Sequence, residues 1–369
     1  MSVQLGALLL VVGSVIWPSH TFAQQSPASE ERKWEIEVHG GGIRVGKPTD
    51  ATTAMPAPGE PFTTTNARPS RYVSSWYFGD GAALRNQNAA AIPIDARIVP
   101  LDSVLTGVAA RPSNAGSYGL RVSRRLTSRL TAEFNADYGR FRLEWLDSAL
   151  TEIEASRASF ASVWNGAFGT GPFLNPVVTS LSQIDEGGGG QFVTTGTLKV
   201  TLRRSGPLVP YVTGGLGGAF SRGRAPSVTL KGSYAAGFVF QGQGGILVRF
   251  DEADSVTVRL VQPERALVGV VGGGFTHDLS ERHGLRVDLR LHVRPNAIDT
   301  EVSARPTVTT GTPAWRLASG VTPSVQFSNM GSSEIRSSLS GPAISAFKTR
   351  EGSGVQIDTA LTIGYFRRF

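Results

Sequence analysis

Cysteine is absent from the 369 residues of the chain. Disulfides, thiolate metal sites and cysteine nucleophiles are therefore excluded together. Beyond its first residues the sequence also lacks any apolar run that approaches the roughly 18 residues required by a membrane helix. Only helices and closed barrels satisfy all their backbone hydrogen bonds in lipid, so a mature chain that spans a membrane must do so as a β-barrel.

Signals of catalysis and cofactor binding are equally scarce. The histidines of the mature chain are His39, His277, His283 and His292. They lack the H-E-x-x-H spacing of a metal site. Outer-membrane acyl hydrolases carry a serine two positions after a histidine, and no histidine here is followed by serine at that position. The stretch "GGIRVGKP", residues 41–48, has P-loop spacing, but Pro48 replaces the required hydroxyl. We therefore expect no catalytic residue, no cofactor and no metal, with a hydrolase built across strands as the least favoured alternative.

The N-terminus carries the features of an export signal. "LGALLLVVGSVI", residues 5–16, is apolar, and "TFA" at 21–23 supplies the small residues of a cleavage site. No Lys or Arg precedes residue 32, so the usual basic start is missing. We expect residues 1–23 to be a signal peptide, and a short uncleaved anchor is the alternative.

Glycine and proline are abundant, with 44 and 21 residues, and convincing helical stretches are few, which favours an all-β protein. Segments of about ten residues with alternating apolar and polar side chains recur along the chain, as in membrane barrels. The candidates are residues 34–45, 115–125, 129–143, 190–204, 208–222, 266–278, 284–294 and 356–369. These segments make an even number of strands, as bacterial barrels require.

The connections between these segments alternate between short and long. "LTS", "SGP" and "LSERH" are tight turns of about three to five residues. The long connections are residues 46–114, 144–189, 223–265 and 295–355. Outer-membrane barrels have short periplasmic turns and long extracellular loops. The pattern predicts one closed antiparallel transmembrane β-barrel over residues 24–369, with eight strands as the simplest count.

Parts of the long connections have their own periodicity. Apolar residues recur at three- and four-residue spacings through 146–164, which predicts one short amphipathic helix that caps the barrel mouth or forms a contact surface. The stretches "SVTLKGSYAA" and "DSVTVRLV", residues 227–236 and 254–261, either extend strands beyond the membrane or form an additional pair. A barrel of ten to twelve strands is therefore the main architectural alternative.

Side-chain parity separates an apolar face from a charged face. In "GLRVDLRLHV", residues 284–293, the Leu and Val side chains share one face, and Arg286, Asp288, Arg290 and His292 share the other. An eight-stranded barrel is only wide enough to be filled by side chains. We expect a mixed-sign charge network in a largely closed lumen, formed by Arg121, Glu133, Asp137, Lys199, Arg203, Arg286, Asp288, Arg290, His292 and Asp358. A water-lined channel would use the same residues as a polar lining.

Several stretches together resemble a known family. An N-terminal signal, "PYVTGGLGGAF", "VVGGGFTHDLSERHGLRVDLRLHV" and a terminal "IGYFRRF" are similar to the bacterial outer membrane protein β-barrel domain family, the small OmpA-like and OmpW-like barrels. The resemblance is clearest over residues 190–294 and at the end of the chain. It implies the barrel fold, an outer-membrane location in a Gram-negative bacterium, and insertion by the barrel assembly machinery.

Two further sets of residues follow from this topology. Leu361, Ile363, Tyr365 and Phe369 share one face of the last segment and form the expected assembly signal, although Arg367 stands where an apolar residue is usual. A basic periplasmic collar is expected from the arginines that flank the short turns. Its members are Arg124, Arg125, Arg129, Arg204, Arg282, Arg367 and Arg368. Arginine can pair with lipid phosphate while its stem lies along apolar surface.

The formal net charge of +7 would suit nucleic acid, but export makes that partner unsuitable and favours outer-membrane lipids. We expect a structural barrel, or one that interacts through extracellular loops whose ligand the sequence does not identify. A small-solute channel or ligand-binding barrel is the alternative.

Overall fold

The computed structural model describes most of the chain after the expected signal peptide. The described residues are 33–46, 50–63, 69–90, 94–171, 173–203, 206–240, 246–310, 328–330 and 335–369. Residues 1–23 lie outside this part, so the signal peptide stays a prediction.

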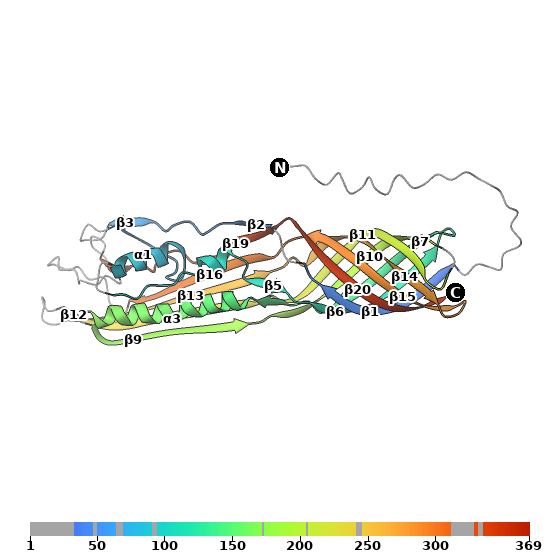
Figure 1. The fold of residues 1–369 in the computed structure, drawn as a ribbon. Coiled ribbons are helices and arrows are strands. Elements are labelled where there is room, and N and C mark those ends of the chain that lie inside the picture. Colours follow the sequence, from blue (N-terminus) through green and yellow to red (C-terminus); the bar gives the residue numbers. More distant parts are fainter. Residues whose placement is uncertain are drawn as a thin grey trace, which may run out of the picture.

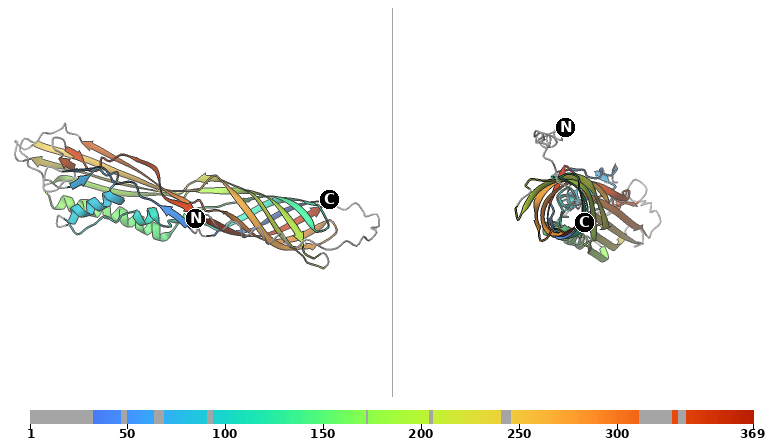
Figure 2. Two further views of the ribbon diagram at one scale, coloured as in Figure 1. Left: turned by 90° about the horizontal axis from the view of Figure 1, so that it is seen from above. Right: turned by 90° about the vertical axis from the view of Figure 1, so that its right-hand side faces the viewer.

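Eight strands form a closed antiparallel barrel, as the alternating segments predicted (Figure 1). In spatial order they are β1 (Trp34–Arg44), β20 (Val355–Arg368), β15 (His283–Pro295), β14 (Arg265–Asp278), β11 (Val209–Arg224), β10 (Gly188–Thr201), β7 (Leu130–Gly139) and β6 (Ala115–Arg125). β1 pairs with β20 on one side and with β6 on the other, which closes the ring seen end-on in Figure 2. The alternative of ten to twelve barrel strands is wrong.

The barrel exterior is an apolar belt. Along β15, Leu285, Val287 and Leu289 point outward and are 39 to 51% exposed, whereas the residues between them are buried. Exposed apolar side chains on the other strands continue the belt, among them Val38, Leu120, Phe134, Leu198, Leu216, Leu267 and Ile363. Exposing this surface to water would be unfavourable at about 25 cal/mol per Å². A closed barrel with such an exterior is suited to span a bilayer.

Six barrel strands continue past one end of the barrel into a second sheet (Figure 1). Its strands, in spatial order, are β2 (Asp50–Thr53), β19 (Ile344–Ser353), β16 (Asp299–Thr310), β13 (Ile246–Val261), β12 (Ser227–Phe240) and β9 (Phe173–Asp185). β12 and β13 contain the two stretches with strand periodicity, and they pair with each other outside the barrel. These stretches therefore extend past the end of the barrel and pair with each other there, and they add no strands to the barrel.

Helices cover one face of this sheet (Figure 1). The sheet and the helices together form a folded unit, which we call the lobe. The helices are α1 (Gly79–Ala90), α2 (Asp102–Thr106) and α3 (Asp147–Gly169). Three short strand pairs complete it: β3 (Pro61–Thr63) with β4 (Pro69–Arg71), β5 (Ala110–Pro112) with β8 (Leu143–Trp145), and β17 (Ser328–Met330) with β18 (Ile335–Ser337). Among the described residues, no helix is long and apolar enough to cross a membrane, a finding that does not bear on strands.

The lobe has a hydrophobic core of its own. Phe160 and Trp164 on α3 are fully buried against the inner face of the sheet, and the Trp164 ring stacks on Tyr234 of β12 at 3.7 Å. The outer face of the sheet carries polar side chains such as Lys231 and Arg305. The long connections therefore fold into a packed layer of sheet and helix. The predicted helix is present as α3, with 23 residues, and α1 and α2 were not anticipated.

Candidate functional site: the charged barrel interior

The interior of the barrel is filled by charged side chains from strands far apart in the sequence. Arg286, on β15, is at its centre and is fully buried. Its guanidinium lies 3.0 Å from a carboxylate oxygen of Glu133 on β7 and 3.0 Å from one of Glu37 on β1, and it also pairs with Glu35. One cation thus joins strands on different sides of the ring.

Arg121, on β6, makes a second set of bridges across the lumen. It donates to Asp288 on β15 at 2.6 Å, lies 3.1 Å from Glu37, and also donates to Asn135. Asp288 accepts another hydrogen bond from the hydroxyl of Tyr211 on β11, at 2.8 Å. Each of these side chains is at most 3% exposed, so their charges are held away from solvent.

Glu133 is the anion shared by most cations. Lys199 on β10, Arg286 and Arg290 lie 3.2, 3.0 and 3.2 Å from its carboxylate, and Arg290 also donates to Asp288 at 2.8 Å. The cations of this layer are Arg121, Lys199, Arg286 and Arg290, and the anions are Glu35, Glu37, Glu133 and Asp288. Equal numbers of the two signs make the layer neutral, which a buried ion network requires if it is not to be strongly unfavourable.

A second polar layer lies nearer the lobe. The Nε2 atom of His39 lies 2.5 Å from Asp137, and its Nδ1 atom lies 3.4 Å from Glu37, so His39 connects the two layers. Arg294 pairs with Asp358 at 2.9 Å, and Gln356 donates to the same carboxylate at 3.0 Å. The interior is therefore polar and paired over these two layers.

Glycines on facing strands make room for these side chains. A Cβ atom on Gly364 would overlap the Glu37 carboxylate, and one on Gly119 would overlap both Asp137 and His39. Both glycines face the lumen of a narrow barrel, where a larger residue would displace an ion pair. The glycine of "IGYF" thus has a packing reason that its place in the sequence alone does not reveal.

Two cavities among the described residues of the barrel lie on either side of the central layer. A cavity of about 280 Å³ at the turn end is lined by Lys199, Tyr211 and Arg368, among others. A smaller one of about 20 Å³, enough for a single water, lies beside His39, Asp137 and His292. These two cavities have no lining residue in common. The Arg286 and Arg121 bridges lie between them.

The structure places nine of the ten expected lumen residues inside the barrel. Arg203 is the exception, because β10 ends at Thr201 and the Arg203 side chain is exposed in the turn that follows. Glu35, Glu37, His39 and Tyr211 also lie in the lumen and were not predicted. The alternation in "WEIEVH", residues 34–39, carried the signal for the first three, since their parity matches an inward face.

The arginines expected to form a collar lie at the barrel end opposite the lobe. Arg124, Arg129, Arg282 and Arg367 are exposed there, and Arg125 is half-buried. Arg368 is different, because it pairs with Asp278 at 2.8 Å and with Glu35 at 3.3 Å and lines the cavity at this end of the barrel. Arg204 lies outside the described residues.

The residues of the expected assembly signal all point out of the barrel. Leu361, Ile363, Tyr365 and Phe369 are 48 to 61% exposed. The end of the chain is held in place, because the backbone N–H of Phe369 donates to the carbonyl of Trp34 at 2.9 Å. Their role in assembly stays a prediction.

The lobe core contains a separate pair of buried acids. Glu252 and Asp254 on β13 face the helices and are 1% exposed. Asp254 accepts hydrogen bonds from the Ser75 hydroxyl and the Trp76 backbone N–H, at 2.9 and 2.6 Å, and Glu252 accepts one from the Tyr234 hydroxyl. Burial raises the pKa of each carboxyl to about 7. Within the described part of the chain neither acid makes an ion pair, so burial outweighs the hydrogen bonds that favour ionisation.

No family model and no curated protein sequence matches the chain. Among solved structures it is similar to the outer membrane protein OprG from Pseudomonas aeruginosa, at 12% identity and a TM-score of 0.36, over 92% of this chain and 97% of that one. It is also similar to the P. putida toluene transporter TodX, at 9% identity and a TM-score of 0.19, over 93% and 91%. Both scores are too low to support an argument about this chain. The function is therefore inferred from the closed barrel and the charged side chains inside it.

Proposed function

We propose that this chain is an outer-membrane protein of a Gram-negative bacterium whose closed barrel anchors and displays the folded lobe outside the cell. The single observation that supports the proposal most directly is the paired charge layer across the lumen, formed around Arg286, Arg121 and Glu133. An open pore needs a water-filled path. These side chains instead join opposite walls of a barrel that is narrow because it has only eight strands.

The orientation follows from the connections. The short turns after β6, β10 and β14 would face the periplasm, and the lobe would face the exterior, as in other barrels of this topology. Export by residues 1–23 and insertion by the barrel assembly machinery belong to the same proposal, as does membership of the small OmpA-like and OmpW-like barrels. In this orientation the exposed arginines at the turn end would meet phospholipid headgroups of the inner leaflet.

Conductance in a planar bilayer tests the anchoring role against a channel. We expect the reconstituted protein to show no stable, porin-sized steps. The Glu133→Gln and Arg290→Gln variants remove ion pairs of the central layer, and occasional openings are expected from them. Stable steps in the wild-type protein that neither substitution alters would show that the lumen is open and that the charged residues only line it.

A further inference from the structure

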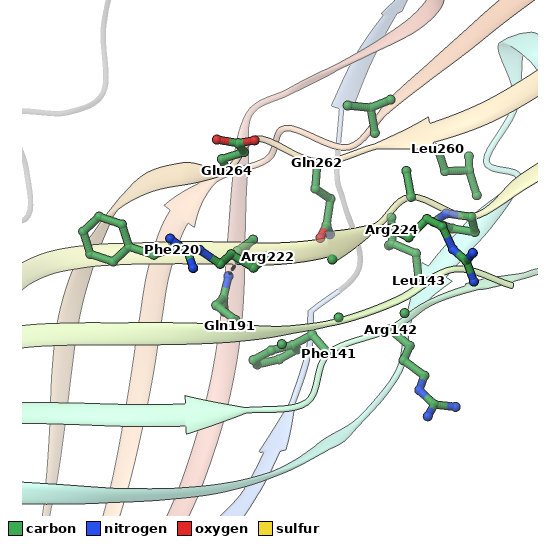
Figure 3. A pocket seen from close by; sticks show the side chains of 18 of the residues that line it. Phe141, Arg142, Leu143, Gln191, Phe220, Arg222, Arg224, Leu260, Gln262 and Glu264 are labelled. Atoms are coloured by element: carbon green, nitrogen blue, oxygen red, sulfur yellow. Dashed lines mark hydrogen bonds between the residues drawn. The ribbon is translucent and has the colours of Figure 1, made fainter.

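A further cavity lies outside the charge network, where the barrel passes into the lobe (Figure 3). Its volume is about 910 Å³. It forms because neighbouring strands separate at this level. Pairing of β11 with β14 ends with the hydrogen bond from Ser221 to Glu264, and pairing resumes with the bond from Leu260 to Pro226. We call this space the junction cavity.

Arginine dominates the lining of the junction cavity. Arg142, Arg222, Arg224, Arg259 and Arg265 contribute to it, and all are exposed. Figure 3 shows Arg222 and Arg224 on the same strand, β11. Glu264 is the only carboxylate among the lining residues. Of these arginines only Arg224 makes an ion pair within the described residues, with Asp185 at 3.3 Å. The lining of the cavity therefore carries a net positive charge, and four of its arginines make no ion pair within the described part of the chain.

Aromatic residues indicate the depth at which this cavity lies relative to the apolar belt. Tyr118, Tyr138, Phe192 and Phe220 are successive register partners across β6, β7, β10 and β11, near the lobe ends of these strands. Phe220 is in turn opposite Arg265 on β14. Aromatic girdles mark the two membrane–water boundaries of a barrel. The arginines thus begin where the apolar belt ends, at the depth of lipid headgroups.

We propose that the junction cavity binds the phosphate groups of a glycolipid in the outer leaflet. Guanidinium groups bind phosphate bidentately and tolerate partial desolvation, which suits a cavity with several unpaired arginines. The acyl chains of the same lipid would lie along the neighbouring belt, where Phe192 and Phe220 are each 43% exposed. Free phosphate or a soluble sugar phosphate would make no use of this apolar surface. The inference rests on the proposed function, because it needs the lobe end to lie in the outer leaflet.

Binding of lipid A to detergent-solubilised, folded protein tests this assignment. The bisphosphorylated form and its dephosphorylated counterpart are titrated separately, and retained lipid is measured by mass spectrometry of the intact complex. We expect the dephosphorylated form to bind at least about tenfold more weakly, and the double variant Arg222→Gln/Arg265→Gln to lose about the same factor, as for a lost charge-assisted contact. The variant Arg222→Lys/Arg265→Lys keeps the charge, so its affinity for the bisphosphorylated form should lie between those of the wild type and the Gln variant.

A matched variant on the same side of the membrane controls for overall charge. Lys231→Gln/Arg305→Gln removes two exposed cations from the outer face of the lobe and should bind as the wild type does. Heat-modifiability on gels verifies that each variant is folded. Equal binding of the two lipid forms, or unchanged binding by the Arg222/Arg265 variant, would overturn the site. Complete competition by inorganic phosphate at matched phosphate concentration would overturn the lipid as its occupant.

The outcome of the lipid-binding experiment does not depend on whether the proposed anchoring function is correct. It is done in detergent, so it depends neither on whether the lumen conducts nor on which end of the molecule faces outward. A conducting barrel would contradict the anchoring role and leave the lipid measurement valid.

Discussion

Glu133 is the residue on which the central layer of the lumen depends most. Three cations lie within 3.2 Å of its carboxylate, and it is 4% exposed. Glu133→Gln keeps the shape of the side chain but leaves these cations without their shared anion. Removal of one partner from a buried ion network typically costs about 3 to 5 kcal/mol. We expect a loss of that size in the free energy of unfolding, measured by urea titration in a fixed detergent or bilayer.

The rim provides a matched control for Glu133. Asp278 pairs with Arg368 at 2.8 Å but is 47% exposed, so Asp278→Asn should change the free energy of unfolding by no more than about 1 kcal/mol. Equal effects of the two substitutions would mean that the lumen is more hydrated than the buried network implies.

Glu252 and Asp254 predict a pH dependence that is confined to the lobe. Their folded-state pKa of about 7 lies above the ordinary values of 4.5 and 3.8, because burial favours the protonated form. The contribution of these two acids to the free energy of unfolding of the lobe is fully present below their unfolded-state pKa. It is lost as pH rises toward their folded-state pKa. Each group can contribute on the order of 3 kcal/mol to this loss. The unfolding temperature of the lobe should therefore fall between pH 4 and about pH 7 and level off above it.

Tryptophan fluorescence can follow this transition, since Trp76 and Trp164 are both buried in the lobe. Asp254→Asn keeps an oxygen that accepts the Ser75 and Trp76 hydrogen bonds but cannot ionise. This variant should show a shallower fall with pH and a more stable lobe at pH 8. A variant with the same pH profile as the wild type would assign the titration to another group.

At the scale of elements, the barrel could be predicted from sequence, whereas only one helix and two strand stretches of the lobe could. Most barrel strands alternate an apolar side chain toward lipid with a polar one toward the lumen, and this period is visible in single stretches such as residues 284–293. The lobe strands face a packed core on one side and water on the other, which is the pattern of any soluble sheet. Only residues 227–236 and 254–261 had a visible strand period, and their local sequence left open whether they extend barrel strands or add a pair; the other lobe strands were placed within the long connections.

The helices of the lobe show the same limit. α3 has apolar residues at helical spacing, and it was predicted. α1, "GDGAALRNQNAA", has two glycines and few large apolar residues, so no helical stripe is visible. Its Arg85 is 3% exposed and lies over the Trp164 ring at 4.5 Å. A helix that is anchored by such a contact is specified by tertiary packing more than by its own sequence.

The contact between α3 and the sheet should control the stability of the lobe separately from that of the barrel. Trp164→Ala removes a fully buried ring that stacks on Tyr234, and such a truncation typically costs about 3 to 5 kcal/mol. We expect the lobe to unfold at a lower temperature, or to become protease-sensitive, with the barrel still heat-modifiable on gels. The exposed neighbour Asn165→Ala should leave both transitions within about 0.5 kcal/mol. Simultaneous loss of the barrel would show that the two parts fold as one unit.

At the scale of the whole molecule, the barrel and the lobe form one elongated body, with the barrel turns at one end and the lobe at the other (Figures 1 and 2). The barrel wall between its turns and the lobe is apolar outside and ion-paired inside. One end carries exposed arginines on short turns, and the other carries the lobe with its polar outer sheet face. Insertion is therefore possible in only one register relative to the membrane, since any axial shift would place charges in lipid.

Direction of insertion is testable because the chain has no cysteine of its own. Lys231→Cys places a thiol on the outer face of the lobe, and Arg282→Cys places one in the turn between β14 and β15. We expect a membrane-impermeant maleimide to label the first variant on intact cells, and the second only after the outer membrane is permeabilised, because the two sites lie beyond opposite ends of the apolar belt. Labelling of both on intact cells would show that the belt does not span the bilayer. The reverse order would place the lobe in the periplasm, and the junction cavity could then no longer meet an outer-leaflet lipid.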